Sequence, residues 1–179
     1  MSNAVEHVAV TLLRREPACG RSRIVAIDGR SGAGKTEFAH QLANRLDAPV
    51  FSLEEIYPGW HGLEAAIPML RDILADLAVD EVSKTHRWDW AQDRPGAPLT
   101  VAPSPLLIVD GVGSGAAAIR PFLSLLVWLD ASEETRRRRA LARDGEVYRP
   151  WWTVWAEQES RLLGREHTPA AADILVRTG

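Results

Sequence analysis

Gly29-Arg30-Ser31-Gly32-Ala33-Gly34-Lys35-Thr36 is the stretch that decides the fold of this 179-residue chain. It matches G-x-x-x-x-G-K-[ST], the phosphate-binding P-loop. The glycines let the backbone turn tightly and bring N–H groups against a polyphosphate, the lysine adds charge at the β- and γ-phosphate oxygens, and the threonine hydroxyl can bind Mg²⁺. We therefore expect the phosphates of ATP to be held by Gly29, Ser31, Gly32, Ala33, Gly34, Lys35 and Thr36.

The segments on both sides of this loop favour a P-loop over a glycine-rich turn that happens to contain a lysine. The apolar residues 23–28 predict a short buried strand, and residues 36–46 carry apolar side chains at helical spacing. A strand, a glycine-rich loop and a helix N-terminus together form an anion-binding site. The sequence therefore predicts a nucleotide-binding strand–loop–helix unit.

Length and composition indicate one globular domain over residues 1–179. Hydrophobic residues make up 46% of the chain and charged residues 25%, as is usual for soluble domains. The net charge of −3 provides no basic field, so we expect no nucleic-acid partner. Apolar runs are far too short to cross a bilayer, so we expect no membrane partner.

The cysteine usage and the N-terminus point to the cytoplasm. The single Cys19 cannot form an internal disulfide, and the first residues lack the long apolar core of a signal peptide. The histidines show no metal-ligand spacing. The sequence does not decide the oligomeric state, and a homo-oligomer is compatible with it.

Strands alternate with helices along the rest of the chain, which predicts a parallel sheet. The cluster of prolines and glycine in residues 92–105 predicts a loop. Helical periodicity predicts helices over residues 5–15, 63–77, 132–143 and 151–163. Apolar runs predict further strands over residues 49–53, 106–110, 125–130 and 173–177.

Carboxylates follow two of the predicted strands, at the sheet edge where open α/β sheets bind ligands. Asp110 ends one strand, where a Walker-B carboxylate holds Mg²⁺; the alternative is a turn residue before Gly111. Glu54 and Glu55 follow the strand at 49–53, where a carboxylate could take the proton of a substrate hydroxyl; the alternative is two solvated acids. Adjacent acids cannot both point into one pocket, so we expect only one to act.

Two other segments carry candidate ligand-binding groups. Trp88-Asp89-Trp90 places a carboxylate between large aromatic rings, which suits a polyol or a ribose; the alternative is two core tryptophans beside a surface aspartate. Residues 143–150 have the polarity and the glycine of a short lid. Arg139 and Arg143 share a helix face, and lid arginines neutralise a transferring phosphoryl group; the alternative is a charged helix paired with its own acids.

From residue 24 to residue 177 the chain resembles the uridine kinase and phosphoribulokinase-like family of P-loop kinases. Residues 52–57 lie where uridine kinases carry Ser-x-Asp-Ser-Phe-Tyr, which places Glu54 on the catalytic base and Tyr57 on an aromatic residue beside the nucleoside. Asp89 lies on an aspartate that holds ribose hydroxyls, and Asp110 on a Glu-Gly step. Residues 135–144 match the start of the lid helix, and residues 172–176 resemble the closing strand.

This resemblance implies an α/β P-loop NTPase sandwich of three layers, with a central parallel sheet of about five strands, helices on both faces and a short lid. It also implies that the P-loop strand is central in the sheet. One departure concerns the base-recognition segment. Uridine kinases carry Tyr and His residues after the Asp-Gly step, whereas residues 112–118 here have neither. A pocket rejects a wrong base through polar groups that would be left unpaired, so uridine specificity does not follow.

We interpret the sequence as an ATP- and Mg²⁺-dependent small-molecule kinase that phosphorylates a hydroxyl of a nucleoside- or sugar-like acceptor. Thr36 and Asp110 are expected to hold Mg²⁺, and Glu54, Tyr57 and Asp89 to bind the acceptor. The alternatives are an NTP-hydrolysing switch and a non-catalytic ATP-binding protein. The expected catalytic residues are Lys35, Glu54, Arg139 and Arg143.

Overall fold

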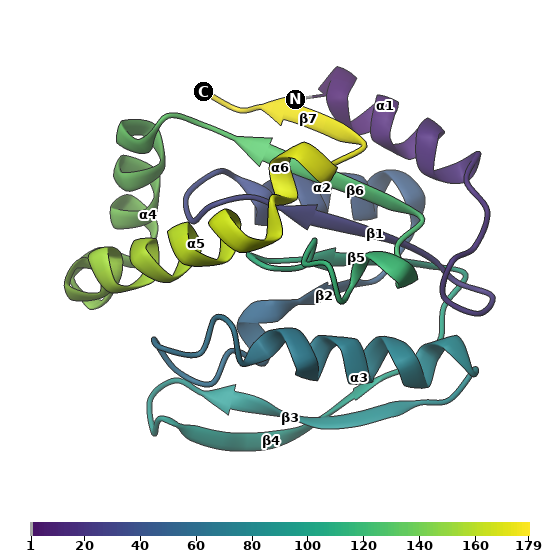
Figure 1. Cartoon of the computed structure of the whole chain (residues 1–179), viewed down its shortest axis with the longest axis horizontal. Helices are drawn as coiled ribbons and strands as arrows, with labels where there is room; N and C mark the ends of the chain where they lie inside the picture. Colours follow the sequence, from purple (N-terminus) through teal and green to yellow (C-terminus); the bar gives the residue numbers. More distant parts are fainter. Residues whose placement is uncertain (1) are drawn as a thin grey trace.

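A computed structural model describes residues 2–179, apart from the side chains of residues 144 and 146. A parallel sheet runs through the molecule in the order β2-β5-β1-β6-β7, so the P-loop strand β1 is central, as predicted (Figure 1). The strands of this sheet are β1 (Arg23–Asp28), β2 (Val50–Ser52), β5 (Leu106–Asp110), β6 (Leu125–Asp130) and β7 (Ile174–Arg177).

The described part of the chain also contains six α-helices and three short 3-10 turns. The helices are α1 (Ser2–Leu13), α2 (Lys35–Leu46), α3 (Ala66–Ala78), α4 (Glu133–Tyr148), α5 (Trp152–Glu166) and α6 (Thr168–Ala171). The 3-10 turns are η1 (Leu53–Glu55), η2 (Arg120–Phe122) and η3 (Arg149–Trp151). None of the helices is long and apolar enough to cross a membrane, counting the described residues only.

The alternation of side chains along the buried strands builds two cores, one on each face of the sheet. On β1, Val25 and Ile27 belong to the cluster formed with α1 and α2, whereas Ile24 belongs to the cluster formed with α3 and α5. The sheet therefore lies between two layers of helices, which confirms the three-layer α/β fold predicted from the sequence.

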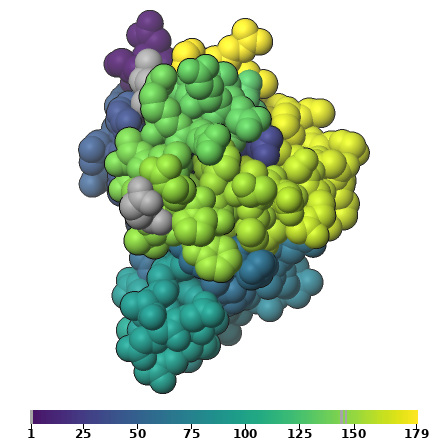
Figure 2. Space-filling model, turned by 90° about the vertical axis from the view of Figure 1, so that its left-hand side faces the viewer, coloured from purple at the N-terminus to yellow at the C-terminus, as the bar shows by residue number. Residues whose placement is uncertain are grey.

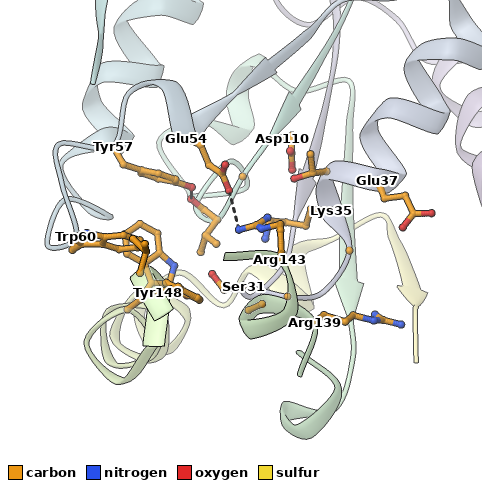
Figure 3. Close-up of a pocket in the computed structure, with 18 of the residues that line it drawn as sticks. Ser31, Lys35, Glu37, Glu54, Tyr57, Trp60, Asp110, Arg139, Arg143 and Tyr148 are labelled. Atoms are coloured by element: carbon orange, nitrogen blue, oxygen red, sulfur yellow. Dashed lines mark hydrogen bonds and ion pairs between the residues drawn. The ribbon is translucent and has the colours of Figure 1, made fainter. Parts of the chain in front are cut away.

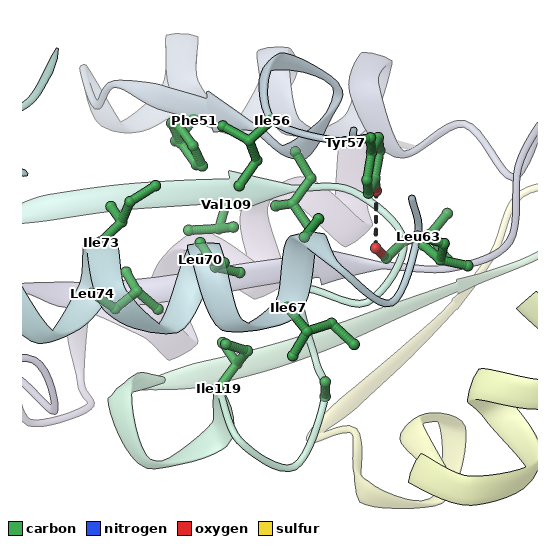
Figure 4. Close-up of a cluster of buried hydrophobic side chains, with 14 of the residues drawn as sticks. Phe51, Ile56, Tyr57, Leu63, Ile67, Leu70, Ile73, Leu74, Val109 and Ile119 are labelled. Atoms are coloured by element: carbon green, nitrogen blue, oxygen red, sulfur yellow. Dashed lines mark hydrogen bonds between the residues drawn. The ribbon is translucent and has the colours of Figure 1, made fainter. Parts of the chain in front are cut away.

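The core beneath α3 also fixes the chain that follows β2. Ile67 and Leu70 of α3 pack in one cluster with Val109 of β5 (Figure 4). Tyr57 is buried in the same cluster, and its hydroxyl donates to the carbonyl oxygen of Val112 over 2.9 Å. The loop between β2 and α3 is thus anchored to the loop after β5.

The structure differs from the sequence prediction in residues 92–105, where the expected loop is wrong over most of its length. β3 (Ser83–Asp89) and β4 (Arg94–Val101) form a separate antiparallel hairpin beside α3. Both strands of a two-stranded sheet are edge strands, so prolines without an N–H are tolerated. Leu99 and Val101 pack into the core. In the space-filling view the hairpin (teal) stands out below the segment of α4 and α5 (green to yellow-green) (Figure 2).

Residues 143–150, which the sequence predicts as a short lid, form the end of α4 and the start of η3. Helical structure thus resumes after a kink at Gly145, beyond residue 143, where the sequence predicted the end of the helix. That these residues act as a lid stays a prediction. Gly145 adopts non-helical angles inside α4, with φ of 58° and ψ of −138°. Glycine adopts positive φ without the clash of a Cβ, so this position allows the chain to turn toward α5.

Candidate active site

A cavity of about 660 Å³ opens at the carboxyl ends of β1, β2 and β5. Ser31, Lys35 and Thr36 line it from the P-loop, Glu54 from η1 and Asp110 from the end of β5 (Figure 3). Arg139 and Arg143 of α4 also line it. The structure therefore brings together most of the residues that the sequence selected.

The P-loop leads directly into α2, and its shape depends on glycine. At Gly32, φ is 78°, and an added Cβ would lie 2.1 Å from the carbonyl oxygen of Arg136. Gly34 occupies the N-cap of α2 with φ of 91°, and no side-chain cap bonds the first amides of the helix. Free amides at a helix N-terminus bind anions, so this end of the cavity suits the phosphates of a nucleotide.

Asp110 and Thr36 provide the groups that a magnesium ion needs. Asp110 is buried, and its Oδ1 has no hydrogen-bond partner among the described residues. Burial raises the pKa of this carboxyl, while the charge of Lys35 and the hydroxyl of Thr36 lower the pKa. An unpartnered carboxylate oxygen beside a hydroxyl fits a cation that takes its other ligands from phosphates and water.

No cluster of three or more His, Cys, Asp or Glu that could hold a metal is found in the part of the chain that the structure describes. A magnesium site completed by substrate phosphates does not require such a cluster. The residues present therefore fit Mg²⁺ bound together with a nucleotide.

Glu54 and Glu55 point to different partners, as expected for adjacent acids. The side chain of Ser52 accepts a hydrogen bond from the amide of Glu54 over 3.3 Å and so caps η1. Glu54 lines the cavity, with its Oε1 3.6 Å from Nη2 of Arg143. Glu55 forms an ion pair with Arg87 of β3. The geometry favours Glu54 as the carboxylate available to a substrate.

The arginines of α4 occupy distinct places. Arg139 lines the cavity and donates to Oγ1 of Thr178 over 3.2 Å, and Arg143 pairs with Glu54. Arg136, which the sequence analysis did not select, is buried and donates to the carbonyl oxygen of Ser31 over 3.3 Å. α4 therefore supports the P-loop as well as lining the cavity.

Two buried carboxylates that sequence reasoning missed hold the P-loop in place. Asp28 ends β1 and accepts hydrogen bonds from the amides of Gly29, Gly113 and Gly115 over 2.7, 3.1 and 2.9 Å. Burial raises the pKa of Asp28 and the three hydrogen bonds lower it by less, so the pKa is about 6. The interaction joins the P-loop to the loop that follows β5.

The second of these carboxylates is Glu159 of α5. Its side chain is 1% exposed and accepts from Nε of Arg30 over 2.9 Å and from the amide of Ser31 over 2.6 Å. Glu159 lies on the same buried face of α5 as Trp152, Trp155 and Leu162. An acid at an apolar position of a helical pattern is the signal that could have identified it.

The far end of the cavity is aromatic. Trp60 stacks on Tyr148, with ring centroids 5.5 Å apart, and Trp90 contacts Trp60 at 4.9 Å. Tyr57 and Trp155 form a T-shaped pair, with ring centroids 5.0 Å apart. These side chains come from the loop after η1, from the hairpin and from α4 and α5, and all of them line the cavity.

Asp89 is not among the residues that line this cavity, whereas its neighbour Trp90 is. Oδ1 of Asp89 accepts hydrogen bonds from the amides of Ala91 and Gln92, both over 3.0 Å. In this arrangement the carboxylate stabilises the turn of the hairpin. Its role in acceptor binding stays a prediction.

Sequence comparison finds distant relatives among kinases. No protein-family model matches the chain. A cytidylate kinase of Pyrobaculum aerophilum is 27% identical over 143 residues, which span 76% of this chain and 68% of that protein. A cytidylate kinase of Pyrobaculum calidifontis is 29% identical over 126 residues, which span 68% of this chain and 61% of that protein. The matched part therefore spans 61% to 68% of the length of these two relatives.

Solved structures resemble the chain over nearly its whole length. A possible uridine kinase from Bacillus stearothermophilus superposes with a TM-score of 0.68 at 19% identity, covering 97% of each chain. A candidate fructose transport system kinase from Silicibacter sp. TM1040 has a TM-score of 0.63 at 18% identity, covering 96% of this chain and 98% of that one. The chain therefore has the fold of the P-loop kinases, similar to uridine kinase-like structures and distantly related in sequence to cytidylate kinases.

Proposed function

We propose that this protein transfers the γ-phosphoryl group of ATP to a hydroxyl of a small molecule. The observation that carries the proposal is the position of Glu54. Its carboxylate lines the same cavity as Lys35, Thr36 and Asp110, and lies between these groups and the aromatic end (Figure 3). A phosphate site, a candidate base and a separate compartment for an acceptor thus adjoin one another.

On the donor side, the amides of the P-loop and Lys35 bind the β- and γ-phosphates. Thr36 and Asp110 would hold Mg²⁺, which when bound neutralises charge on these phosphates. Arg139 lines the cavity beside Gly34 and adds positive charge near the transferred group. Phosphoryl transfer depends mainly on positioning and electrostatics, so these groups account for most of the chemistry.

On the acceptor side, Glu54 takes the proton of the hydroxyl. The hydroxyl oxygen forms a bond to the γ-phosphorus while the bond from that phosphorus to the bridging oxygen breaks, and ADP leaves with the electron pair. Arg143, paired with Glu54, orients the carboxylate and lies where charge develops. A switch that only hydrolyses NTP has no use for the aromatic end of the cavity, which favours the kinase.

The test is ADP release from Mg²⁺-ATP in the presence of nucleosides, cytidine monophosphate, sugars and aromatic alcohols, with product phosphorylation checked by mass. We expect ADP release that depends on an added alcohol. Equal release without any acceptor would identify a hydrolase, and tight ATP binding without turnover on any acceptor would identify a binding protein.

A further inference from the structure

Helix α5 carries two adjacent polar side chains on its buried face. Gln158 is 6% exposed and Glu159 is 1% exposed, and they share this face with Trp155 and Leu162. Glu159 accepts hydrogen bonds from the P-loop. Gln158 bonds instead to the loop of residues 58–63, which carries Trp60 and which we call the Trp60 loop. One helix therefore reaches both ends of the cavity through neighbouring residues.

The side chain of Gln158 holds the Trp60 loop at two points. Its Nε2 donates to the carbonyl oxygen of Trp60 over 2.8 Å, and its Oε1 accepts from the amide of Leu63 over 3.4 Å. Nε2 also donates to the carbonyl oxygen of Val154, one turn earlier in α5, over 3.3 Å. All three partners are backbone groups, so the position calls for a side chain that both donates and accepts.

The Trp60 loop has a tight turn of its own, but that turn does not attach it to α5. The amide of Gly59 donates to the carbonyl oxygen of Tyr57 over 2.9 Å, and the amide of Gly62 donates to that of Gly59 over 3.1 Å. An added Cβ at Gly62 would lie 2.5 Å from the carbonyl oxygen of Pro58. These contacts lie within the chain of the turn, so they fix its shape and not its place against the helix.

The place of the loop matters through the ring of Trp60. This ring lines the cavity and stacks on Tyr148, with ring centroids 5.5 Å apart (Figure 3). Trp90 of the hairpin and Trp155 of α5 contact it at 4.9 and 6.4 Å. Hydrogen bonds have narrower limits of distance and angle than ring contacts have, so the bonds of Gln158 define the position of this ring most closely.

Resting on the proposed function, we infer that Gln158 is a positioning residue for the acceptor, because it holds the Trp60 loop against α5 as Glu159 holds the P-loop. Loss of the Gln158 bonds should therefore weaken acceptor binding and leave ATP binding unchanged. Loss of the Glu159 bonds should do the opposite. A residue needed only for folding would impair the binding of both substrates.

The first test measures both KM values in Gln158→Met, which keeps the length of the side chain and removes its donor and its acceptor. The acceptor used is whichever of uridine, cytidine, ribose and benzyl alcohol gives the fastest ADP release from Mg²⁺-ATP with the wild-type protein. We expect the acceptor KM to rise about tenfold and the ATP KM to change less than about twofold. Glu157→Gln, at an exposed neighbour on α5, is the matched control and should change neither.

Gln158→Glu separates positioning from packing through its dependence on pH. A protonated glutamate has the shape of glutamine and can donate to the carbonyl oxygen of Trp60, whereas an ionised one can only accept. Burial raises the pKa of such a carboxyl, so the protonated form persists to higher pH than in water. Relative to wild type, the acceptor KM should be nearly unchanged at about pH 5 and rise several-fold by about pH 8. In Gln158→Met this ratio should not depend on pH.

The other titratable groups near this position are common to all the proteins compared. They are His61 of the Trp60 loop and Glu159, which is paired with Arg30. Dividing each KM by the wild-type value at the same pH therefore removes their contribution. Gln158→Glu at low pH keeps both bonds to the loop, so it remains informative if Gln158→Met does not fold.

Hydrogen exchange tests the same contact without any acceptor. In Gln158→Met, or in Gln158→Glu at high pH, the amide of Leu63 should exchange about tenfold faster than in wild type, and the amide of Ser31 at the wild-type rate. This pattern without any ADP release would support the positioning role and overturn the proposed phosphoryl transfer. Equal rises in both KM values, a pH-independent ratio in Gln158→Glu or unchanged exchange at Leu63 would overturn the inference.

Discussion

The two ends of the cavity are built in opposite ways. The phosphate end comes mainly from one continuous stretch, residues 29–36, and offers backbone amides, a lysine and a threonine hydroxyl. The aromatic end is assembled from Tyr57, Trp60, Trp90, Tyr148 and Trp155, which are far apart in the chain. The phosphate end is therefore encoded locally, whereas the aromatic end depends on how distant segments pack.

The two ends also differ in how they are supported. Buried carboxylates tie the P-loop to its surroundings through several hydrogen bonds at 2.6 to 3.1 Å. The aromatic end is held mainly by contacts between rings. Ring contacts tolerate substitution better than a buried charge does, so we expect changes at the phosphate end to have the larger effects.

The largest effect is expected for Lys35→Ala. Its Nζ lies 3.3 Å from the carbonyl oxygen of Arg30 at the phosphate end. In the proposed reaction, we expect its charge to stabilise the transition state more than the ground state. Steady-state kinetics should show no measurable phosphoryl transfer, while thermal melting shows a folded protein. Wild-type kcat at saturating ATP would mean that the P-loop assignment is wrong.

The next effect concerns the boundary between the two ends. Glu54→Gln should lower kcat by about 10² to 10⁴, the range for a lost general base. Glu55→Gln is the matched control, because Glu55 pairs with Arg87 away from the cavity, and its kcat should change little. The reverse result would move the base by one residue.

Asp28 should make the stability of the phosphate end depend on pH. Its folded pKa of about 6 exceeds the usual 3.8, so the folded state keeps a proton that the unfolded state has lost. This contribution to stability is present below about pH 4 and is lost as pH rises through 6, in total roughly 3 kcal/mol. Urea unfolding at pH values from 4 to 7 should show that the free energy of unfolding falls less with rising pH in Asp28→Asn than in wild type. Equal pH dependence of the two proteins would contradict the raised pKa of Asp28.

Glu159→Gln tests the support of the P-loop. Glutamine keeps an oxygen for the amide of Ser31 but leaves Arg30 without its charge partner, which should cost roughly 2 kcal/mol of stability. We expect the KM for ATP to rise about tenfold and the acceptor KM to stay nearly constant. Glu157→Gln, an exposed acid on the same helix, is the control. Equal rises in both KM values would indicate a general loss of structure.

The smallest effect is expected at Asp89, where the sequence and the cavity point to different residues. Asp89→Asn retains an acceptor oxygen for the turn, so the acceptor KM should change less than about twofold, whereas Trp90→Ala should raise it several-fold. A large rise in acceptor KM for Asp89→Asn, with ATP binding unchanged, would support the role predicted from the resemblance.

Several features could be predicted because their signals are local. The buried strands and the P-loop are visible as short patterns, and the central position of β1 follows from the resemblance. The hairpin of β3 and β4 could not be predicted in the same way. Its prolines indicate a loop, and only pairing with another edge strand and packing of Leu99 and Val101 make a strand favourable there.

The sequence by itself determined the nucleotide end of this protein, because a P-loop works through backbone amides and adjacent side chains. Tertiary structure decided the rest of the site. It gave Glu54 and Glu55 different surroundings, one in the cavity and one paired with Arg87. It brought Glu159 against Arg30 and Ser31, which lie 129 and 128 positions away in the chain. It also placed Trp90 in the lining of the cavity, to which Asp89 does not belong. Such contacts depend on burial and on partners distant in the chain, which no local pattern specifies.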